Sequence, residues 1–273
     1  MSIIHGRELT YRYSSAQKNA IDNIDIDVEV GELVAILGGD GCGKTTLAKL
    51  INGLLLPESG KLKVADVDVD QKMDIRRLRE KVGMVFQDPY EQFVSSAVED
   101  DVAFGLENNM VSGDEIKGLV SLALARVGLQ GFEKRDPMSL SEGQRQRVAI
   151  AGVLALDSDI IIFDEATALL DVEGRHDFLG IIKELHERWH KTILMVTSYV
   201  GECITADRVI LMKDGRIRAQ GKPEDILPDE ELMAECGLIS TVTCRIFNEL
   251  KREGLVEGEC PLKAEELVEV LCP

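Results

Sequence analysis

The strongest constraint on the fold is a buried apolar run that leads directly into a cluster of glycines. Residues 33–37 read LVAIL, and such a run is typical of a strand that is buried on both faces. Residues 38–45 then read GGDGCGKT, and residues 45–54 carry apolar side chains at helical spacing. A strand, a glycine loop and a helix in this order predict a phosphate-binding loop.

The glycine loop fits the pattern G-x-x-x-x-G-K-T, which suits a triphosphate for physical reasons. Glycines let the backbone curl so that several N–H groups point at one anion, and the following helix adds its positive end. Lys44 is expected to reach the β- and γ-phosphates, and Thr45 to ligate magnesium. An ordinary glycine-rich turn is the alternative, but it does not require the Lys-Thr pair. The residues predicted here to bind the nucleotide are Gly38, Gly39, Asp40, Gly41, Cys42, Gly43, Lys44, Thr45 and Thr46.

A second candidate element is an apolar run that ends in two acids. Residues 160–163 read IIIF and lead into Asp164 and Glu165. A buried strand that ends in carboxylates holds them at the edge of the sheet where ligands of open α/β sheets bind. Asp164 is expected to hold magnesium, directly or through water, and Glu165 to polarise an attacking water as general base. Two acids after a strand are often only a solvated turn, but their place downstream of the glycine loop favours the catalytic interpretation.

Strands and helices alternate along most of the chain, which predicts an α/β fold with a largely parallel sheet. Residues 1–30 alternate between apolar and charged side chains as strands do, and residues 192–196 form a further apolar run. The expected helices cover residues 112–132, 139–156 and 177–189. After Pro228 the chain becomes charged and mostly helical. We therefore expect a main domain over 1–228 and a small second domain over 229–273.

The composition limits the classes of partner. The 273 residues carry a formal net charge of -18, which argues against broad nucleic-acid binding and against a polybasic membrane anchor. The apolar runs are far shorter than the ~20 residues that a bilayer-spanning helix needs, and the N-terminus lacks the pattern of a signal peptide. The six cysteines are scattered without a CxxC pair, so they are expected to be free thiols in a reducing cytosol. Any membrane role is expected to come from docking on a partner.

A third motif lies between the glycine loop and the acidic strand, and with it the chain resembles the ABC ATPase family. Residues 140–144 read LSEGQ and are followed by RQRVAIA, which is similar to the signature motif of that family and its helix. P-loop GTPases and kinases lack this motif. Ser141 is also an ordinary helix N-cap, and both interpretations hold because the family uses this helix N-terminus to address the γ-phosphate bound by the other subunit. The resemblance implies that Ser141, Gly143 and Gln144 contact ATP across a dimer.

The resemblance also assigns roles to other segments. Residues 85–89 (VFQDP) resemble the Q-loop, in which Gln87 touches magnesium and the residues after it contact the membrane protein. Residues 168–171 (ALLD) resemble the D-loop. Tyr13, at the end of the first strand, resembles the aromatic residue that stacks on adenine. Tyr11 is a rival, and either tyrosine could instead be a half-buried strand residue.

Finer features resemble the energy-coupling factor transporters, which import vitamins and metal ions. Residues 87–93 (QDPYEQF) and 98–105 (VEDDVAFG) are similar to their long Q-loop region, and residues 163–167 (FDEAT) to one of their two ATPase paralogues. The tail after Glu230 resembles their C-terminal dimerisation segment. The fold implied is α/β, with a RecA-like, mostly parallel core sheet, an antiparallel β subdomain, a helical signature subdomain over about 88–156 and a small helical C-terminal extension.

The resemblance further implies a reaction and a set of partners. The chain would bind ATP with Mg²⁺ and pair with a paralogous ATPase or a second copy of itself. ATP hydrolysis would energise an integral membrane coupling protein and a substrate-binding membrane protein. The chain would lie on the cytoplasmic face of the cell membrane, with no nucleic acid as partner.

Some positions depart from the family pattern and leave alternatives open. The family places a switch histidine after the strand at 192–196, where this chain has Ser198, which lacks the reach of an imidazole to the γ-phosphate. Glu142 stands where the family prefers glycine, and Asp40 is expected to point away from a triphosphate because like charges repel. One alternative is an ATP-binding regulatory half with weak hydrolysis, which Ser198 supports and Glu165 opposes. Another is an ATPase of a different ABC class, such as a soluble one of DNA repair or translation, which the acidic charge disfavours.

Overall fold

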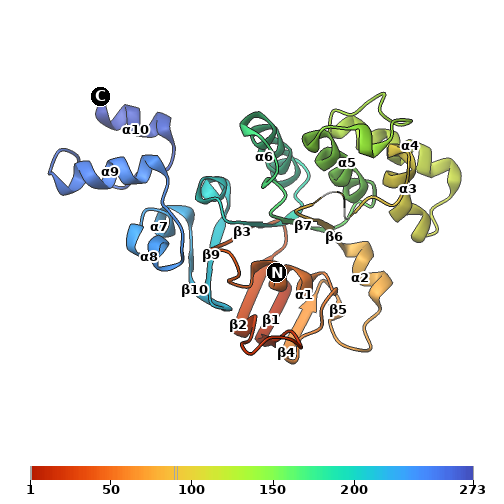
Figure 1. Ribbon diagram of the computed structural model, residues 1–273, viewed down its shortest axis with the longest axis horizontal. Coiled ribbons are helices and arrows are strands. Elements are labelled where there is room, and N and C mark those ends of the chain that lie inside the picture. The colour runs from red at the N-terminus through yellow and green to blue at the C-terminus, as the bar shows by residue number, and fades with distance from the viewer. Residues whose placement is uncertain (1, 89, 91, 273) are drawn as a thin grey trace.

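Mostly parallel strands form the central sheet of the computed structural model (Figure 1). The structure describes residues 2–88, 90 and 92–272; Pro89 and Glu91 of the expected Q-loop segment therefore lie outside the described residues. The strand order is β10-β9-β3-β8-β7-β6, and only the β9–β10 pair among these neighbours is antiparallel. In chain order the strands are β3 (Leu33–Gly38), β6 (Val82–Val85), β7 (Ile160–Asp164), β8 (Thr192–Thr197), β9 (Arg208–Lys213) and β10 (Arg216–Gly221). The predicted α/β fold is confirmed.

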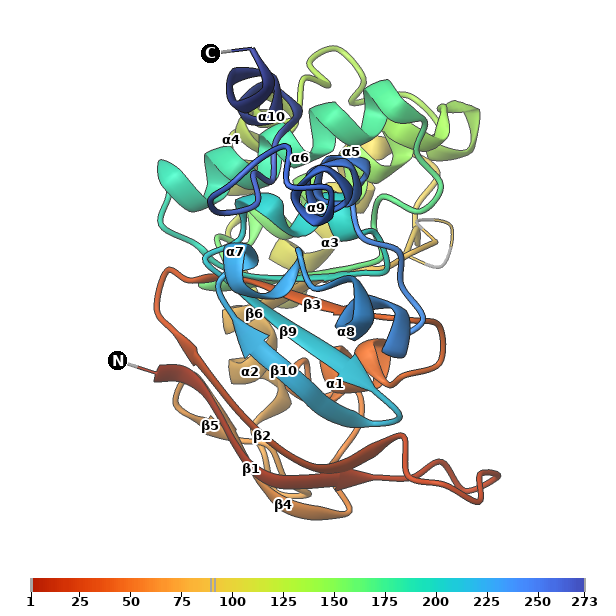
Figure 2. The same ribbon diagram turned by 90° about the vertical axis from the view of Figure 1, so that its left-hand side faces the viewer.

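A second, antiparallel sheet and the first helix cover one face of the central sheet (Figures 1 and 2). Its strand order is β2-β1-β4-β5. The strands are β1 (Ser2–Tyr11), β2 (Ile21–Glu29), β4 (Ser59–Val64) and β5 (Val67–Asp68), and the helix is α1 (Lys44–Ile51). One apolar core joins these layers, because Ile26 of β2, Leu47 of α1 and Ile36 of β3 belong to the same buried cluster. The antiparallel β part implied by the resemblance is thus present.

Helices cover the other face of the central sheet and extend beyond one end of it (Figure 1). They are α3 (Val98–Asn108), α4 (Gly113–Arg126), α5 (Glu142–Ala155) and α6 (Val172–Glu187), with a 3₁₀ turn over Pro137–Ser139 preceding α5. The short α2 (Ile75–Lys81), which precedes β6, packs instead in the core on the side of the antiparallel sheet (Figure 1). α3 and α4 pack on α5 and on each other. No helix among the residues that the structure describes has both the length and the apolar character needed to cross a membrane.

Two of these helices differ from the sequence prediction. α6 begins at Val172 instead of 177, because the Asp171 carboxylate accepts the Gly174 N–H at 2.7 Å and caps the helix. α3 occupies residues that the sequence analysis assigns to a long Q-loop region. Its first turn holds three acids, which the positive helix N-terminus favours, and Val102 and Leu106 bury one face of it.

After the main sheet the chain continues through short helices toward its C-terminus. A 3₁₀ turn over Val200–Thr205 follows β8, and the C-terminal helices are α7 (Pro223–Ile226), α8 (Glu230–Glu235), α9 (Val242–Arg252) and α10 (Ala264–Leu271). α8 lies against the β9–β10 hairpin (Figure 2), where Glu235 pairs with Arg218 at 2.9 Å and with Lys213 at 3.4 Å. α9 and α10 contact each other and stand apart from the sheets (Figure 1).

Four parallel strands end at one edge of the central sheet, and this edge collects the predicted site residues. β3 runs into the glycine loop, β6 leads to Gln87, β7 ends at Asp164 and β8 ends at Thr197. Each of these strands is buried along its whole length. Because both faces are packed, the strand ends are rigid supports for the polar residues that follow them.

Candidate active site

The glycine loop adopts a conformation that requires glycine at position 43. Gly43 has a φ of 109°, and a Cβ there would lie 2.4 Å from the carbonyl oxygen of Ala20. Gly41 also has a positive φ, of 72°. α1 begins at Lys44, so the loop closes onto the free backbone N–H groups of a helix N-terminus. This concave surface of amides suits a phosphate group.

Lys44 is buried inside the loop and already has partners. Its side chain is 4% exposed, and Nζ donates to the carbonyl oxygens of Gly38 at 2.8 Å and Gly39 at 3.1 Å. The same Nζ lies 3.3 Å from Oε1 of Glu165. The structure therefore brings together the two charged residues to which the sequence analysis assigns phosphate binding and base catalysis.

Thr45 and Asp164 form a pair of oxygen donors at the carboxyl end of β7. Thr45 Oγ1 donates to Asp164 Oδ1 at 2.9 Å. Burial raises the pKa of Asp164 and the Glu165 carboxylate raises it further, while the Thr45 hydrogen bond and the charges of Lys49 and Lys44 act in the opposite direction. A nearby divalent cation would favour the charged form.

These oxygens fit magnesium better than a metal held by protein ligands alone. Within residues 2–88, 90 and 92–272, no three His, Cys, Asp or Glu side chains gather as a metal-binding group. Mg²⁺ typically takes one or two protein ligands and completes its shell with phosphates and water. Thr45, Asp164 and the nearby Gln87 are the residues that would hold it, and its charge would offset that of a triphosphate.

Most of the predicted nucleotide ligands line one cavity of about 550 Å³. They are Tyr13, Asp40, Gly41, Gly43, Lys44, Thr45, Thr46 and Gln87, and the predicted base Glu165 lines the same cavity together with Ala20. The Tyr13 hydroxyl is 3.2 Å from Thr46 Oγ1, whereas Tyr11 packs against the core and meets the Tyr13 ring edge-on. Tyr13 is thus the tyrosine that faces the cavity. Asp40 is exposed and lines the cavity as well, whereas charge repulsion led us to expect that it points away.

Glu165 has a strained backbone at the point where chemistry is expected. Its φ is 49°, in the left-handed region that a side chain with a Cβ rarely adopts. Its N–H donates to the Val196 carbonyl at 2.9 Å, which ties it to β8. Strain of this kind costs about 1–3 kcal/mol and is found most often at functional sites.

The signature residues lie in a different cavity of the same chain. Ser141 caps α5 by accepting the Gln144 N–H at 3.3 Å, while Gln144 Oε1 accepts the Ser141 N–H at 3.2 Å. Ser141, Gly143 and Gln144 line a cavity of about 610 Å³ together with Leu170 and Asp171 of the D-loop segment. The phosphate loop lines no part of that cavity. One chain therefore carries two separate groups of predicted ATP ligands.

Ser198 lies at the edge of this arrangement. It directly follows β8 and is half-buried, but it lines neither of the two cavities described above. The neighbouring Tyr199 is exposed, and its ring stacks under the Arg175 guanidinium at 3.9 Å. The side chain of Tyr199 is thus held by α6.

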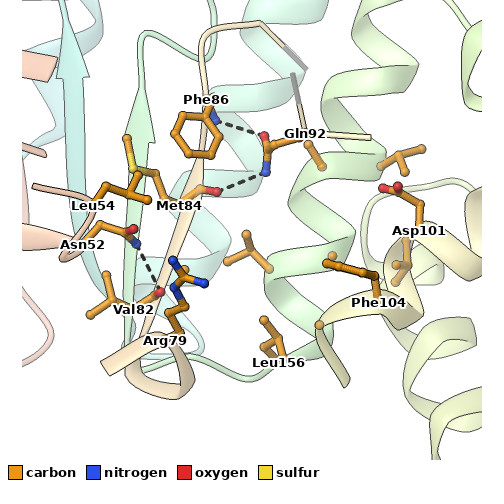
Figure 3. Close-up of a pocket in the computed structure, with 17 residues that line it drawn as sticks. Asn52, Leu54, Arg79, Val82, Met84, Phe86, Gln92, Asp101, Phe104 and Leu156 are labelled. Atoms are coloured by element: carbon orange, nitrogen blue, oxygen red, sulfur yellow. Dashed lines mark hydrogen bonds between the residues drawn. The ribbon is translucent and has the colours of Figure 1, made fainter. Parts of the chain in front are cut away.

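A third cavity, of about 290 Å³, lies between β6, α3 and α5 (Figure 3). The Gln92 amide anchors the Q-loop beside it by accepting the Phe86 N–H at 3.1 Å and donating to the Met84 carbonyl at 3.2 Å. Leu54, Phe104 and Leu156 supply apolar walls. Leu54 and Phe104 are both exposed. No local sequence pattern indicates this groove, because its walls come from distant segments.

The C-terminal segment contacts the phosphate loop, although residues 229–273 were expected to be a separate domain. The Gly39 N–H donates to the Cys236 carbonyl at 3.2 Å, and a Cβ on Gly39 would lie 2.8 Å from that oxygen. Cys236 directly follows α8, so the C-terminal end of α8 is hydrogen-bonded to the phosphate loop. No local pattern near Cys236 signals this contact, since the carbonyl belongs to the backbone.

Comparison with known proteins places these features in a family. The family model described as ABC transporter matches residues 21–168. The Energy-coupling factor transporter ATP-binding protein EcfA1 of Clostridium novyi (strain NT) is 40% identical over 274 residues, covering 99% of this chain and 98% of that protein. The protein of the same name from Bacillus subtilis (strain 168) is 41% identical over 270 residues, covering 98% and 96%.

Solved structures agree with the sequence comparison. The structure of cbiO1 from Clostridium perfringens, described as part of the ABC transporter complex cbiONQ, matches with a TM-score of 0.77 at 36% identity. It covers 92% of this chain and 99% of that chain. A dimeric structure of the ATP-binding cassette MJ0796 in a post-hydrolysis state, bound to ADP and Pi, matches with a TM-score of 0.74 at 28% identity, covering 81% and 98%.

Replacing Lys44 by alanine is expected to remove most or all nucleotide binding. Without the ammonium, only backbone dipoles would offset the triphosphate charge. Titration of the purified protein with ATP at physiological salt measures the effect. Lys63→Ala, on an exposed position of β4, is the matched control. Equal ATP affinity in the two variants would contradict the assignment.

Proposed function

This chain belongs to the ABC transporter family, among its energy-coupling factor ATP-binding proteins, and we propose that it hydrolyses ATP on its phosphate loop to energise a membrane importer. The carrying observation is the convergence of Lys44, Thr45, Asp164 and Glu165 at one edge of the sheet. A phosphate cradle and a candidate base therefore line one cavity, and Asp164 is hydrogen-bonded to Thr45 at its edge. This is the set of groups that phosphoryl transfer to water requires.

Each residue of this site has a distinct proposed role. The loop amides and Lys44 bind the phosphates, and Tyr13 stacks on the adenine. Thr45, Asp164 and Gln87 hold Mg²⁺, which supplies charge compensation when bound. Glu165 orients and deprotonates the attacking water.

We further propose that two ATPase subunits close head to tail on two ATP molecules. The phosphate loop and the signature helix N-terminus of one chain line different cavities. Each ATP would be held by the loop of one subunit and by Ser141, Gly143 and Gln144 of the other. The second subunit is a paralogous ATPase, or a second copy of this chain.

The groove of Figure 3 is the surface that we assign to the membrane partner. It lies beside the Q-loop and combines exposed apolar side chains with Arg79 and Asp101. A helical segment of an integral membrane coupling protein would fit such a surface. A separate membrane protein would bind the transported solute, a vitamin or a metal ion. The ATPase would lie on the cytoplasmic face of the membrane, docked on the coupling protein.

The less supported hypothesis is that this chain is the regulatory subunit of an ATPase heterodimer and hydrolyses ATP only weakly. Ser198 favours it because a serine is too short to replace a histidine at the γ-phosphate. Glu165, however, lies in the cavity with Lys44 and Thr45. A site that had lost its chemistry would not need this charged pair in place.

Glu165→Gln is the experiment that tests the proposed function. The amide keeps the shape of the side chain but loses the base, so ATP affinity should persist while turnover by this site largely disappears. ATP titration and single-turnover hydrolysis in the assembled complex measure the two effects. Glu187→Gln, at the far end of α6, should behave as the unaltered protein does. Normal hydrolysis by Glu165→Gln would assign the base to another residue.

Ser198→His tests whether the two sites of the dimer are unequal. A histidine here would restore a hydrogen bond to the γ-phosphate, and one such transition-state contact is worth ~10²–10³ in rate. Hydrolysis should rise by that order in a complex whose partner has its catalytic glutamate disabled, so that only this site reports. Ser198→Ala gives the baseline. An unchanged rate would mean that this chain is an ordinary catalytic subunit.

The exposed apolar face of α9 is predicted to drive subunit pairing. Val242 and Ile246 lie one helical turn apart and are 68% and 43% exposed, whereas Phe247 is buried. Val242→Glu with Ile246→Glu should weaken the dimer, measured by sedimentation, and leave ATP affinity intact. These point changes spare α8, whose removal would also disturb the phosphate loop.

The matched control for the α9 changes is Leu122→Glu. Leu122 lies on α4 and is 49% exposed, so it tests the general effect of a charge on an exposed apolar helix position. Undiminished pairing in the α9 variant would give the C-terminal segment another role.

A further inference from the structure

A buried glutamate that the proposed chemistry does not use lies next to the catalytic segment. Glu202 belongs to the 3₁₀ turn after β8, and its side chain is 4% exposed. Its Oε1 accepts the hydroxyl of Thr167 at 2.6 Å, and its Oε2 accepts the hydroxyl of Thr197 at 2.5 Å. Both threonines are buried as well. Each carboxylate oxygen of Glu202 therefore fixes one hydroxyl.

The two threonines lie in the two segments next to Glu165, one on its own chain segment and one at the end of β8. Thr167 comes two residues after Glu165, directly before the D-loop segment. Thr197 ends β8 and follows Val196, whose carbonyl accepts the Glu165 N–H at 2.9 Å. One carboxylate thus ties together the two segments between which Glu165 is held.

This arrangement explains how Glu165 keeps its left-handed backbone. A strained conformation persists only where the surrounding structure over-determines it. The N–H of Glu165 is bonded to β8, its carbonyl accepts the Ala168 N–H at 3.0 Å, and Thr167 is pinned by Glu202. If Thr167 and Thr197 were released from each other, the backbone at Glu165 could relax.

A cation and an aromatic ring complete the network. Arg175 Nε lies 3.5 Å from Glu202 Oε1, and the Arg175 guanidinium stacks on the Tyr199 ring at 3.9 Å. The Tyr199 N–H donates to Thr197 Oγ1 at 3.0 Å. Glu202 therefore also links the first turn of α6 to the segment after β8, in which Ser198 lies.

We propose that Glu202 is the positioning residue for Glu165: by bonding Thr167 and Thr197 at once, it holds the strained glutamate where it can meet the attacking water. This inference rests on the proposed role of Glu165 as base. It does not place Glu202 in contact with the nucleotide. The effect is expected on the chemical step and not on ATP binding, because the side-chain bonds of Glu202, Thr167 and Thr197 described above do not reach the phosphate loop.

The sharpest test removes the hydroxyl of Thr167 or Thr197 in one variant and retains it in a second. Thr167→Val and Thr197→Val keep the size of the side chain, whereas Thr167→Ser and Thr197→Ser keep the hydroxyl. In the assembled complex, with only this site reporting, each valine variant should lower kcat by about 10- to 100-fold and leave KM for ATP nearly unchanged. Each serine variant should recover most of the lost kcat.

A matched control comes from the other end of the same strand. Thr192 is buried at the start of β8, and its hydroxyl accepts the Gly31 N–H at 3.0 Å, away from the site. Thr192→Val should lower the melting temperature as the other valine variants do but keep normal kcat. A kcat in Thr167→Val and Thr197→Val equal to that of Thr192→Val would overturn the proposal.

Glu202→Gln tests the carboxylate that bonds both threonines. An amide group would present N–H atoms to one of the hydroxyls, and the Thr197 oxygen already accepts the Tyr199 N–H. The kcat of Glu202→Gln should fall as in the valine variants. Adding Thr167→Val to it should lower kcat little further, because both changes disrupt the same hydrogen bond between Glu202 and Thr167. If the kcat losses of Glu202→Gln and Thr167→Val were fully additive in the double variant, the positioning role of Glu202 would be contradicted.

These experiments distinguish a failure of the Glu202 proposal from a failure of the proposed function. If Glu165→Gln abolishes turnover while the threonine variants do not, only the positioning role of Glu202 is wrong. If Glu165→Gln leaves turnover intact, the assignment of the base fails, whatever the threonine variants do.

Discussion

The buried ammonium of Lys44 is the interaction on which the site depends. A buried charge without partners is costly, and here the carbonyls of Gly38 and Gly39 and the carboxylate of Glu165 surround it. The carbonyls face the ammonium only because the glycine loop curls, and Glu165 reaches it only because β7 and β3 both flank β8. A bound triphosphate offers the same ammonium a stronger partner. Nucleotide binding would therefore weaken the hold of Lys44 on Glu165 and leave that carboxylate free for water.

The loop around Lys44 is braced by segments that are remote in sequence. The Ala20 carbonyl leaves no room for a side chain at Gly43, and the Gly215 N–H donates to the Cys42 carbonyl at 2.9 Å. The Cys236 carbonyl holds Gly39 from the C-terminal side. The proposed boundary at 228 follows a change in composition, but α8 belongs physically to the nucleotide site. The part of the tail that we propose for subunit pairing therefore begins after α8.

The parts of the site that could be predicted from the sequence are those whose chemistry is local. Lys44 and Thr45 follow a recognisable loop, and Asp164 and Glu165 end a recognisable strand, so strand order alone brings them together. Glu202 gave no such signal, because its partner Thr167 comes from a distant segment and a lone acid in a turn usually faces solvent. The start of α6 was misplaced for a related reason: a cap made by one carboxylate counts for more than the apolar pattern that follows it.

The signature helix contacts the Q-loop segment beside the groove of Figure 3, which bears on how the two proposed subunits communicate. Gln146 of α5 donates to the Phe86 carbonyl at 3.3 Å, and the Arg145 guanidinium lies 4.2 Å from the centre of the Tyr90 ring. A membrane partner seated in the groove would therefore move the Q-loop together with the signature helix. Under head-to-tail pairing that helix addresses the ATP of the opposite subunit, so each membrane contact would act first on the site across the dimer. Glu165, held through β8 to the central sheet, would stay with its own phosphate loop.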